Sequence, residues 1–323
     1  MLELGLVGIG PLWDQVYQPA LQRQCGRLAI RAAYVPVVGR AAQQLGDWNV
    51  CWTESLGQLL SQATIRAVLV LDSAWFQAVP AEWACDRGKP VLLADSLGSD
   101  PKPLWKLAER ARDSGIPLIP DLLHRYTPAT SRLRELLVTR LGRIREIDLW
   151  YRTGDHPEAI PVSSRFLDDP LATGLDWCHL VLGTQPEQWE LVRDQQESRL
   201  QIGFSAPADR SSPARVTLCG AWTPPAAGQP SGRIERVSLR CQNGTAEVTA
   251  PDRIRWQHEG VEREECLAGE RTACDVMIDH FARRVVGGLI PLATLEDALH
   301  ALAWGVIART RGVEGASPAT VGG

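Results

Sequence analysis

The stretch Leu2-Glu-Leu-Gly-Leu-Val-Gly-Ile-Gly-Pro-Leu-Trp13 opens the chain and decides its fold. Residues 2–7 predict a short buried strand, and residues 14–23 can form a helix after the intervening glycine turn. Strand, glycine turn and helix are the opening of a dinucleotide-binding βαβ unit. In such a unit the first glycine permits a tight turn. The second lets backbone N–H groups approach a pyrophosphate, which then lies on the positive end of the helix.

The third glycine position of this motif holds Trp13. A glycine there normally lets helix and strand pack closely, and a bulky indole cannot do so. We therefore expect either a wider turn or a helix that begins later. An ordinary strand–helix turn is the alternative interpretation. If the turn binds a dinucleotide, its candidate cofactor-binding residues are Gly8, Ile9, Gly10, Pro11, Leu12 and Trp13.

The composition is that of a globular protein long enough for two domains, each with its own core. The chain has 323 residues, of which 45% are hydrophobic and 22% charged, and its net charge is -4. This balance predicts no nucleic-acid partner, and no apolar run approaches the ~20 residues that span a bilayer. The N-terminus enters a strand at once, so we expect no signal peptide and a cytoplasmic protein. The eight cysteines include no Cys-x-x-Cys pair, which favours reduced thiols over a metal site.

Strands and helices alternate regularly as far as about residue 120. The further strands are expected at 28–35, 50–52, 67–71, 90–93 and 117–119. This alternation predicts an N-terminal Rossmann domain, a doubly wound parallel sheet, over residues 1–122. Its ligand crevice lies beyond the carboxyl ends of the strands. Candidate cofactor-binding residues at those ends are Asp72, Ser73, Ala74 and Ala94.

The strand at 28–35 ends without the Asp or Glu that often accepts hydrogen bonds from the adenosine ribose. Arg40 follows it and could meet a 2′-phosphate, which would favour NADP over NAD. The alternative is that Arg40 is a solvated residue at the start of the next helix.

Beyond about residue 140 the pattern changes to period-2 runs, and Asn243-Gly244 between two of them indicates a hairpin. We predict a C-terminal α+β domain over residues 123–312 with a large, mostly antiparallel open sheet. Its closing helices span about 274–310, and a tail follows at 313–323. Apolar residues alternate along the strands, which predicts that the outer face of the sheet is apolar. Because an apolar face exposed to water is an aggregation risk, we expect a second copy of the chain to cover it, in a homodimer or homotetramer formed through this sheet. The alternating apolar residues include Val216, Leu218, Val237 and Leu239.

Several segments together resemble one family, that of glucose–fructose oxidoreductase, inositol dehydrogenase and MocA. They are the opening motif at 6–21, Gly88-Lys89-Pro90-Val91-Leu92, the crossover at 125–144, Gly174-Leu175-Asp176-Trp177-Cys178-His179-Leu180, and the closing helices at 278–298. The likeness covers nearly the whole chain. It implies hydride transfer between a sugar-like or cyclitol alcohol and NAD or NADP. It also implies His179 as acid/base, with Asp176, Arg125, Tyr126 and Trp177 around the substrate.

The chain departs from the family pattern at several site positions. Asp95 stands where the family has its catalytic lysine, and Asp72-Ser73 replaces a Thr-Pro. Asp176 and His179 are three residues apart rather than four, which leaves open whether both face the site. Two carboxylates beside a pyrophosphate are unfavourable: at ~6 Å and an effective dielectric of ~20, each like-charge pair costs roughly 2–3 kcal/mol.

Three functional hypotheses follow. The first is a working NAD(P)-dependent oxidoreductase. The second is a redox-inactive relative with a degenerate active site, which binds a ligand or partner. The third is a lyase or hydrolase in which Asp95, with Asp72 or His179, acts as acid/base. Against each stands a structural role: His179 as a hydrogen-bonded helix residue, and the aspartates as caps of the following helices.

Overall fold

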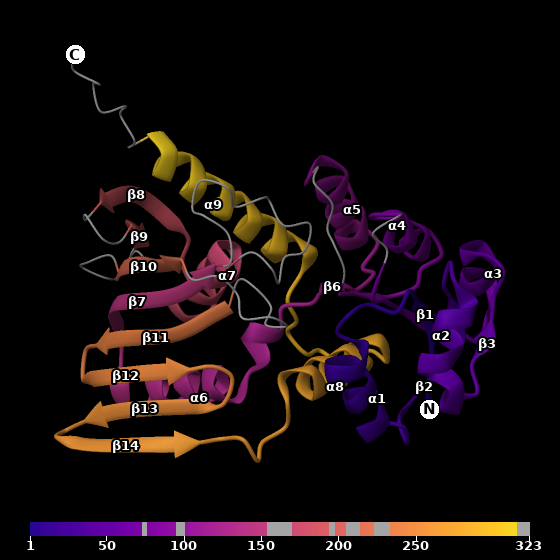
Figure 1. Ribbon diagram of the computed structural model, residues 1–323, viewed down its shortest axis with the longest axis horizontal. Coiled ribbons are helices and arrows are strands. Elements are labelled where there is room, and N and C mark those ends of the chain that lie inside the picture. The colour runs from indigo at the N-terminus through magenta and orange to yellow at the C-terminus, as the bar shows by residue number, and fades with distance from the viewer. Residues whose placement is uncertain are drawn as a thin grey trace. The chain divides into compact units, whose positions relative to one another are not determined.

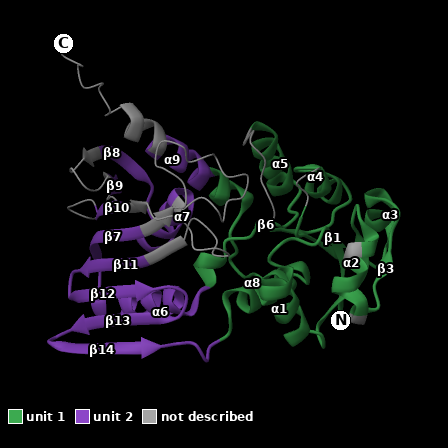
Figure 2. Cartoon of the chain, viewed as in Figure 1, with its two compact units in different colours: residues 1–126, 164–166, 271–299 green, residues 127–163, 167–270, 300–323 purple. Residues whose placement is uncertain are grey.

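The computed structural model describes residues 1–72, 76–94, 101–153, 170–193, 198–204, 214–222 and 233–314. Their contacts divide the chain into two compact units, coloured separately in Figure 2. Among the described residues, unit 1 holds 1–126 and 271–299, and unit 2 holds 127–270 and 300–314. Within the described part of the chain, no helix is both long and apolar enough to cross a membrane.

Unit 1 contains the predicted six-stranded parallel sheet. Its strands are β1 (Leu2–Val7), β2 (Leu28–Tyr34), β3 (Cys51–Trp52), β4 (Ala67–Val70), β5 (Val91–Leu93) and β6 (Leu118–Pro120). The order is β3-β2-β1-β4-β5-β6 and every pairing is parallel. Successive strands are therefore added on one side of β1 as far as β3 and on its other side from β4 onwards. Ligands of doubly wound folds bind at this point, between β1 and β4, where the strand order reverses. The prediction of a Rossmann sheet is confirmed.

Helices cover this sheet, and one of them comes from late in the sequence. The helices of the first half are α1 (Gln18–Arg23), α2 (Val38–Leu45), α3 (Leu56–Ser61), α4 (Val79–Asp86) and α5 (Pro101–Asp113). Helix α8 (Ala273–Val285) packs against α1 and contributes Met277, Ile278 and Phe281 to the core of unit 1 (Figure 1). The sequence pattern grouped this helix with the second domain, because a periodic apolar stripe does not reveal which core receives it.

Unit 2 contains the predicted second sheet. Its eight strands are β7 (Ile144–Thr153), β8 (Pro186–Arg193), β9 (Ser198–Phe204), β10 (Ala214–Trp222), β11 (Arg233–Cys241), β12 (Gly244–Thr249), β13 (Arg253–His258) and β14 (Val261–Cys266). Their order is β14-β13-β12-β11-β7-β10-β9-β8. Of the pairings between these described strands, β7 with β10 is parallel and the others are antiparallel. The predicted α/β fold with a large, mostly antiparallel second sheet is confirmed.

The apolar face of this sheet is covered by the chain's own helices. Val216, Leu218, Val237 and Leu239 are at most 2% exposed. Helix α6 (Pro128–Leu136) packs against β12 and β13, and α7 (Pro170–Leu182) packs against β7, β10 and β11 (Figure 1). The expectation that these residues form an uncovered outer face is therefore wrong. Period-2 alternation shows that a sheet has an apolar face, but not which part of the protein covers it.

The opposite, open face of the sheet is polar. Arg240 forms an ion pair with Glu146, and Arg255 pairs with Glu264 at 3.1 Å. The guanidinium of Arg236 lies 4.3 Å from the ring centre of Trp150. Helix α9 (Leu295–Glu314) ends the described chain.

Candidate functional site

The glycine turn after β1 is packed tightly against the end of β4. Gly8 has a φ of +70°, and a Cβ on it would lie 1.9 Å from the carbonyl oxygen of Asp72. A Cβ on Gly10 would lie 2.4 Å from the carbonyl oxygen of Leu71. Both distances are far below any real carbon–oxygen contact, so the fold itself requires both glycines whether or not a cofactor binds.

Trp13 changes how the following helix begins. The first turn is a π-helix, η1 (Trp13–Tyr17), and α1 starts only at Gln18. In this wider turn the carbonyl of Leu12 accepts hydrogen bonds from the N–H groups of Val16 at 2.9 Å and Tyr17 at 3.2 Å. The Trp13 indole is fully buried, and its ring centre lies 5.7 Å from that of Trp48. The first helical turn is thus wider than an α-helical one, and the α-helix begins later in the sequence. The indole of Trp13 belongs to the core rather than to the glycine turn.

The turn still presents backbone donors. Within the described part of the chain, the N–H groups of Ile9, Gly10 and Leu12 have no backbone acceptor, and Pro11 has no N–H to offer. Such N–H groups before a helix, at the point where strand order reverses, fit the oxygens of a phosphate. The arrangement is therefore compatible with a dinucleotide.

Asp72 lies directly beside this turn. It follows β4, is half-buried, and its Cβ is 3.8 Å from the position that a Gly10 Cβ would take. Ala94 follows β5, and its N–H donates to the carbonyl of Val70 at 2.9 Å. Arg40 lies in α2. Ser73, Ala74 and Asp95 lie outside the described residues.

Three residues expected around the substrate have structural contacts of their own. Arg125, in the short helix η3 (Leu123–Tyr126), forms an ion pair with Asp297 at 3.3 Å. Tyr126 meets the edge of the His280 ring at a centre distance of 5.9 Å. In unit 2, the buried indole of Trp177 donates a 2.9 Å hydrogen bond to Thr130 Oγ1. Substrate binding by these residues stays a prediction.

Asp176 and His179 lie on one face of α7. At about 100° per residue, three positions along a helix turn the side chain by about 300°, which leaves the two about 60° apart. The spacing of three therefore does not separate them. Asp176 is fully buried and His179 is half-buried. His179 Nδ1 lies 2.8 Å from the carbonyl oxygen of Thr184. A carbonyl only accepts, so Nδ1 carries the proton and Nε2 is left as the ring atom that can accept one.

The sequence did not single out a buried pair in unit 1, formed by Tyr17 and Asp121. Asp121 follows β6, and the hydroxyl of Tyr17 donates a hydrogen bond to its Oδ2. Burial raises the pKa of Asp121 to about 7, although the bonds from Tyr17 and from the backbone of Leu123 lower it. A carboxylate directly after an apolar strand was the only signal in the sequence, and it does not reveal the partner.

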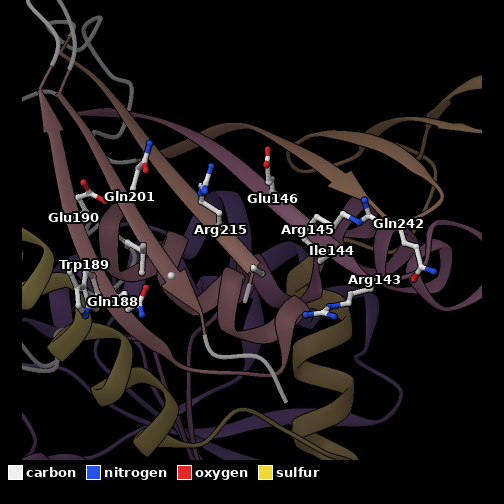
Figure 3. A pocket seen from close by; sticks show the side chains of 13 residues that line it. Arg143, Ile144, Arg145, Glu146, Gln188, Trp189, Glu190, Gln201, Arg215 and Gln242 are labelled. Atoms are coloured by element: carbon white, nitrogen blue, oxygen red, sulfur yellow. The ribbon is translucent and has the colours of Figure 1, made fainter. Parts of the chain in front are cut away.

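A hollow in unit 2 lies away from these residues. A cavity of about 950 Å³ in unit 2 is lined by Arg143, Arg145, Gln188, Glu190 and other mostly polar residues. Figure 3 shows Glu146, Arg215 and Gln201, on neighbouring strands, pointing to the same side of the sheet. None of the described residues named above as site candidates lines it. The described residues also contain no cluster of His, Cys, Asp or Glu suited to a metal ion.

Comparisons with known proteins give structural relatives only. No family model and no curated protein matches the sequence. Among solved structures, aldose-aldose oxidoreductase from Caulobacter crescentus has a TM-score of 0.77 at 15% identity, covering 97% of this chain and 98% of that one. UDP-N-acetylglucosamine 3-dehydrogenase from Acidithiobacillus ferrooxidans has a TM-score of 0.73 at 17% identity, covering 96% and 97%. Levoglucosan dehydrogenase, solved with NADH and levoglucosan, has a TM-score of 0.75 at 14% identity, covering 97% of each chain.

A Rossmann unit and a large, mostly antiparallel second sheet make up the fold of this protein. Its structural neighbours, over the whole chain, are dehydrogenases of the glucose–fructose oxidoreductase, inositol dehydrogenase and MocA type. The chain has their fold, as the resemblance of its motifs implied.

Proposed function

We propose that this protein is an NAD(P)-dependent oxidoreductase acting on a sugar-like or cyclitol alcohol. One observation carries the proposal: among the described residues, the N–H groups of Gly10 and Leu12 in the glycine turn have no backbone acceptor, and they lie where the strand order reverses. Support comes from the fold, because its solved relatives include sugar dehydrogenases, one of them with NADH bound.

The cofactor would be held by the turn residues Gly8–Leu12 at its pyrophosphate and by Ala94 and the residues after β4 towards the nicotinamide, whereas the buried Trp13 supports the turn from the core. When bound, NAD(P) supplies the hydride acceptor. No carboxylate ends β2, and Arg40 lies in the following helix, so we favour NADP over NAD. Asp72 opposes the phosphates and makes binding weaker than in a site without it.

Proton transfer falls to His179, since a suitable lysine is lacking among the described residues. The ammonium of Lys89 donates to the carbonyls of Gln62 at 3.0 Å and Ile65 at 2.5 Å, before β5 begins. Lys102 and Lys106 lie on α5. The Nε2 atom of His179 takes the proton of the substrate hydroxyl, with Asp176 on the same helix face. Arg125, Tyr126 and Trp177 orient the sugar-like substrate.

The first experiment is a calorimetric titration with NAD⁺, NADH, NADP⁺ and NADPH, followed by turnover assays with sugars and cyclitols. We expect micromolar binding, tighter for the NADP pair. His179→Gln should lower kcat about 100-fold or more and leave nucleotide affinity unchanged, as loss of an acid/base does. His258→Gln is the matched control, because His258 Nδ1 also lies against a backbone carbonyl, at 2.9 Å from Asn243. If none of the four nucleotides binds at millimolar concentration, the proposal fails.

The second candidate function is a redox-inactive protein that binds a ligand or partner. The position of Asp72 beside the glycine turn favours it, because a carboxylate there repels a pyrophosphate. It predicts no nucleotide binding, so the same titration separates the two candidates.

We also propose a homodimer or homotetramer formed through the open face of the second sheet. That face is polar, with ion pairs such as Arg240–Glu146 and the half-buried Trp150 under Arg236. Association through such a face depends on charge and is weakened by salt. Sedimentation velocity at 20 μM protein should show an oligomer at about 50 mM salt and partial dissociation at about 1 M. A monomer at both salt concentrations would contradict the proposal.

A further inference from the structure

The hollow of unit 2 lies at one end of the open face of the second sheet. Its volume of about 950 Å³ is within the range of small-molecule pockets. The lining comes from β7, β8, β9 and β10, and from Gln242 in the turn after β11. All of these residues belong to unit 2. None of the described lining residues is assigned above to the cofactor or to the substrate of the proposed oxidoreductase.

Two β-bulges shape this end of the sheet. On β7, Arg145 is an extra residue without a partner on β11, and on β8, Glu187 is an extra residue without a partner on β9. A bulge bends its strand and increases the local twist. The strand order here is β7-β10-β9-β8, so the two bent strands lie on either side of β10 and β9. Between them Gly203 adds no side chain, and a Cβ on it would lie 3.2 Å from Cβ of Gln188.

The bulge in β7 brings an additional charged residue into the hollow. In a regular strand, successive side chains point to opposite faces of the sheet. Here Arg145 is exposed and Glu146 is half-buried, whereas Ile144 and Ile147 on either side of them are buried. Two consecutive polar residues therefore line the hollow where a regular strand would supply one.

The arginines of the hollow are not neutralised by the protein. The register of the sheet places Arg215 and Arg240 on either side of Glu146, and Glu146 forms its ion pair with Arg240. Among the residues that the structure describes, neither Arg215 nor Arg145 forms an ion pair or a side-chain hydrogen bond. Two guanidinium groups are thus left for an anion from solution, and their fork of N–H donors matches a carboxylate or a phosphate.

Groups that suit hydroxyls lie beside these arginines. Gln201 on β9 is paired with Glu190 on β8, which places both side chains on one face of the sheet. Figure 3 shows Gln201 and Arg215 pointing to the same side. An amide both donates and accepts hydrogen bonds, and a carboxylate accepts them from hydroxyl groups. The charge of Glu190 disfavours a second anionic group at this end, so the lining matches a ligand with one anionic end and one hydroxyl-bearing end.

We propose that this hollow binds a small hydroxylated anion, a phosphorylated or carboxylated sugar. Its anionic group contacts Arg215 and Arg145, and its hydroxyl groups contact Gln201 and Glu190. Binding here requires neither NAD(P) nor the residues that would hold it.

Calorimetric titration of nucleotide-free protein with glucose 6-phosphate, glucuronate, glucose and inorganic phosphate tests this assignment. We expect one of the two anionic sugars to bind with a Kd of about 1 mM or below, and the tighter of them identifies the anionic group. Glucose and inorganic phosphate each carry half of the required chemistry and should bind at least about 10-fold more weakly. Absence of binding by both anionic sugars up to about 20 mM would overturn the proposal. So would glucose or phosphate that binds as tightly as they do.

Arg215→Gln locates the ligand. Loss of a hydrogen bond between charged groups should weaken binding of the anionic sugar at least about 10-fold. Arg253→Gln is the matched control, because Arg253 is also exposed and without an ion pair in the described structure, but lies on β13 outside the hollow. Equal losses in the two variants would overturn the proposal. An unchanged affinity in Arg215→Gln would do the same, because the sugar would then bind elsewhere, as at the proposed oxidoreductase site.

Gly203→Thr tests the hollow without changing its charge. Threonine suits a strand, and its side chain would occupy space between the two bulged strands. The melting temperature should stay close to that of wild type, while binding of the anionic sugar weakens at least about 10-fold. Unchanged binding by folded Gly203→Thr would contradict the proposal.

A second copy of the chain is the alternative occupant, because the oligomer proposed above uses the same face of the sheet. Sedimentation velocity of wild type and Arg215→Gln separates the two. A variant that becomes monomeric, together with a wild type that binds neither anionic sugar, would assign the hollow to the second copy and overturn the ligand site.

Discussion

Gly8→Ala is expected to lower the free energy of unfolding by about 3–4 kcal/mol in protein that carries no nucleotide. Two costs combine. Gly8 has a φ of +70°, which strains any L side chain, and the new Cβ would lie 1.9 Å from the Asp72 carbonyl oxygen. Backbone cannot move aside as a flexible side chain can, so β1 and β4 must separate.

Urea unfolding followed by circular dichroism measures this effect. The matched control is Gly39→Ala in α2, where a Cβ would meet nothing within 4 Å. That change should leave stability unchanged or raise it by up to about 0.5 kcal/mol, since Gly39 lies in the first turn of α2, where alanine gains less over glycine than in a helix interior. If Gly8→Ala unfolds like wild type, the close packing of the glycine turn on β4 is refuted.

Asp279→Asn is expected to cost about 2–3 kcal/mol, because it removes the anion at the centre of an arginine cluster. The carboxylate of Asp279 is 2% exposed and receives Arg27 at 2.5 Å, Arg283 at 3.0 Å and Arg271 at 3.5 Å. The arginine side chains are between 51% and 58% exposed, so solvent screens the interaction and the cost is smaller than that of breaking a fully buried pair. Asp86→Asn is the control, since Asp86 forms a single exposed pair with Arg110.

The same arginine cluster predicts the direction in which folding stability changes with pH. Burial would raise the pKa of Asp279, but the hydrogen bond from Arg27 and the charges of the arginines together lower it. The pKa of neighbouring Asp275 is also lowered, since the bonds from Arg23 and Thr272 outweigh burial. Folded values below 3.8 mean that this stabilisation is present above the ordinary pKa and is lost as pH falls through the folded one. The difference in stability between wild type and Asp279→Asn should therefore shrink below about pH 3.8. A difference that is unchanged down to pH 2 would contradict the assignment.

Most of the fold could be predicted from local sequence pattern. Alternation of apolar strands with helices gave the parallel sheet, and the period-2 runs gave the strands of the second sheet. The pattern could not reveal which elements meet across long distances. It placed α8 with the wrong unit and left Val216 and Val237 without the helices that cover them, because an apolar stripe carries no information about its partner.

The candidate site was less predictable. The glycine turn and Asp72 could be placed together because parallel strands end at the same edge of a sheet. The spacing of three between Asp176 and His179 left open whether both face the site, although on a helix it places their side chains only about 60° apart. The Tyr17–Asp121 pair spans 104 residues of sequence, and no spacing rule connects two such positions.

The late origin of α8 has a consequence for synthesis on the ribosome. The first 126 residues complete the six-stranded sheet, yet the helix that packs against α1 belongs to the segment Arg271–Leu299. At roughly 5–20 residues per second, a delay of about 7–30 s separates the two. During that interval Tyr17 and Leu21 lack the residues of α8 with which they share a core. This part of the core of unit 1 can therefore be completed only after residues 127–270 of the second unit have been made.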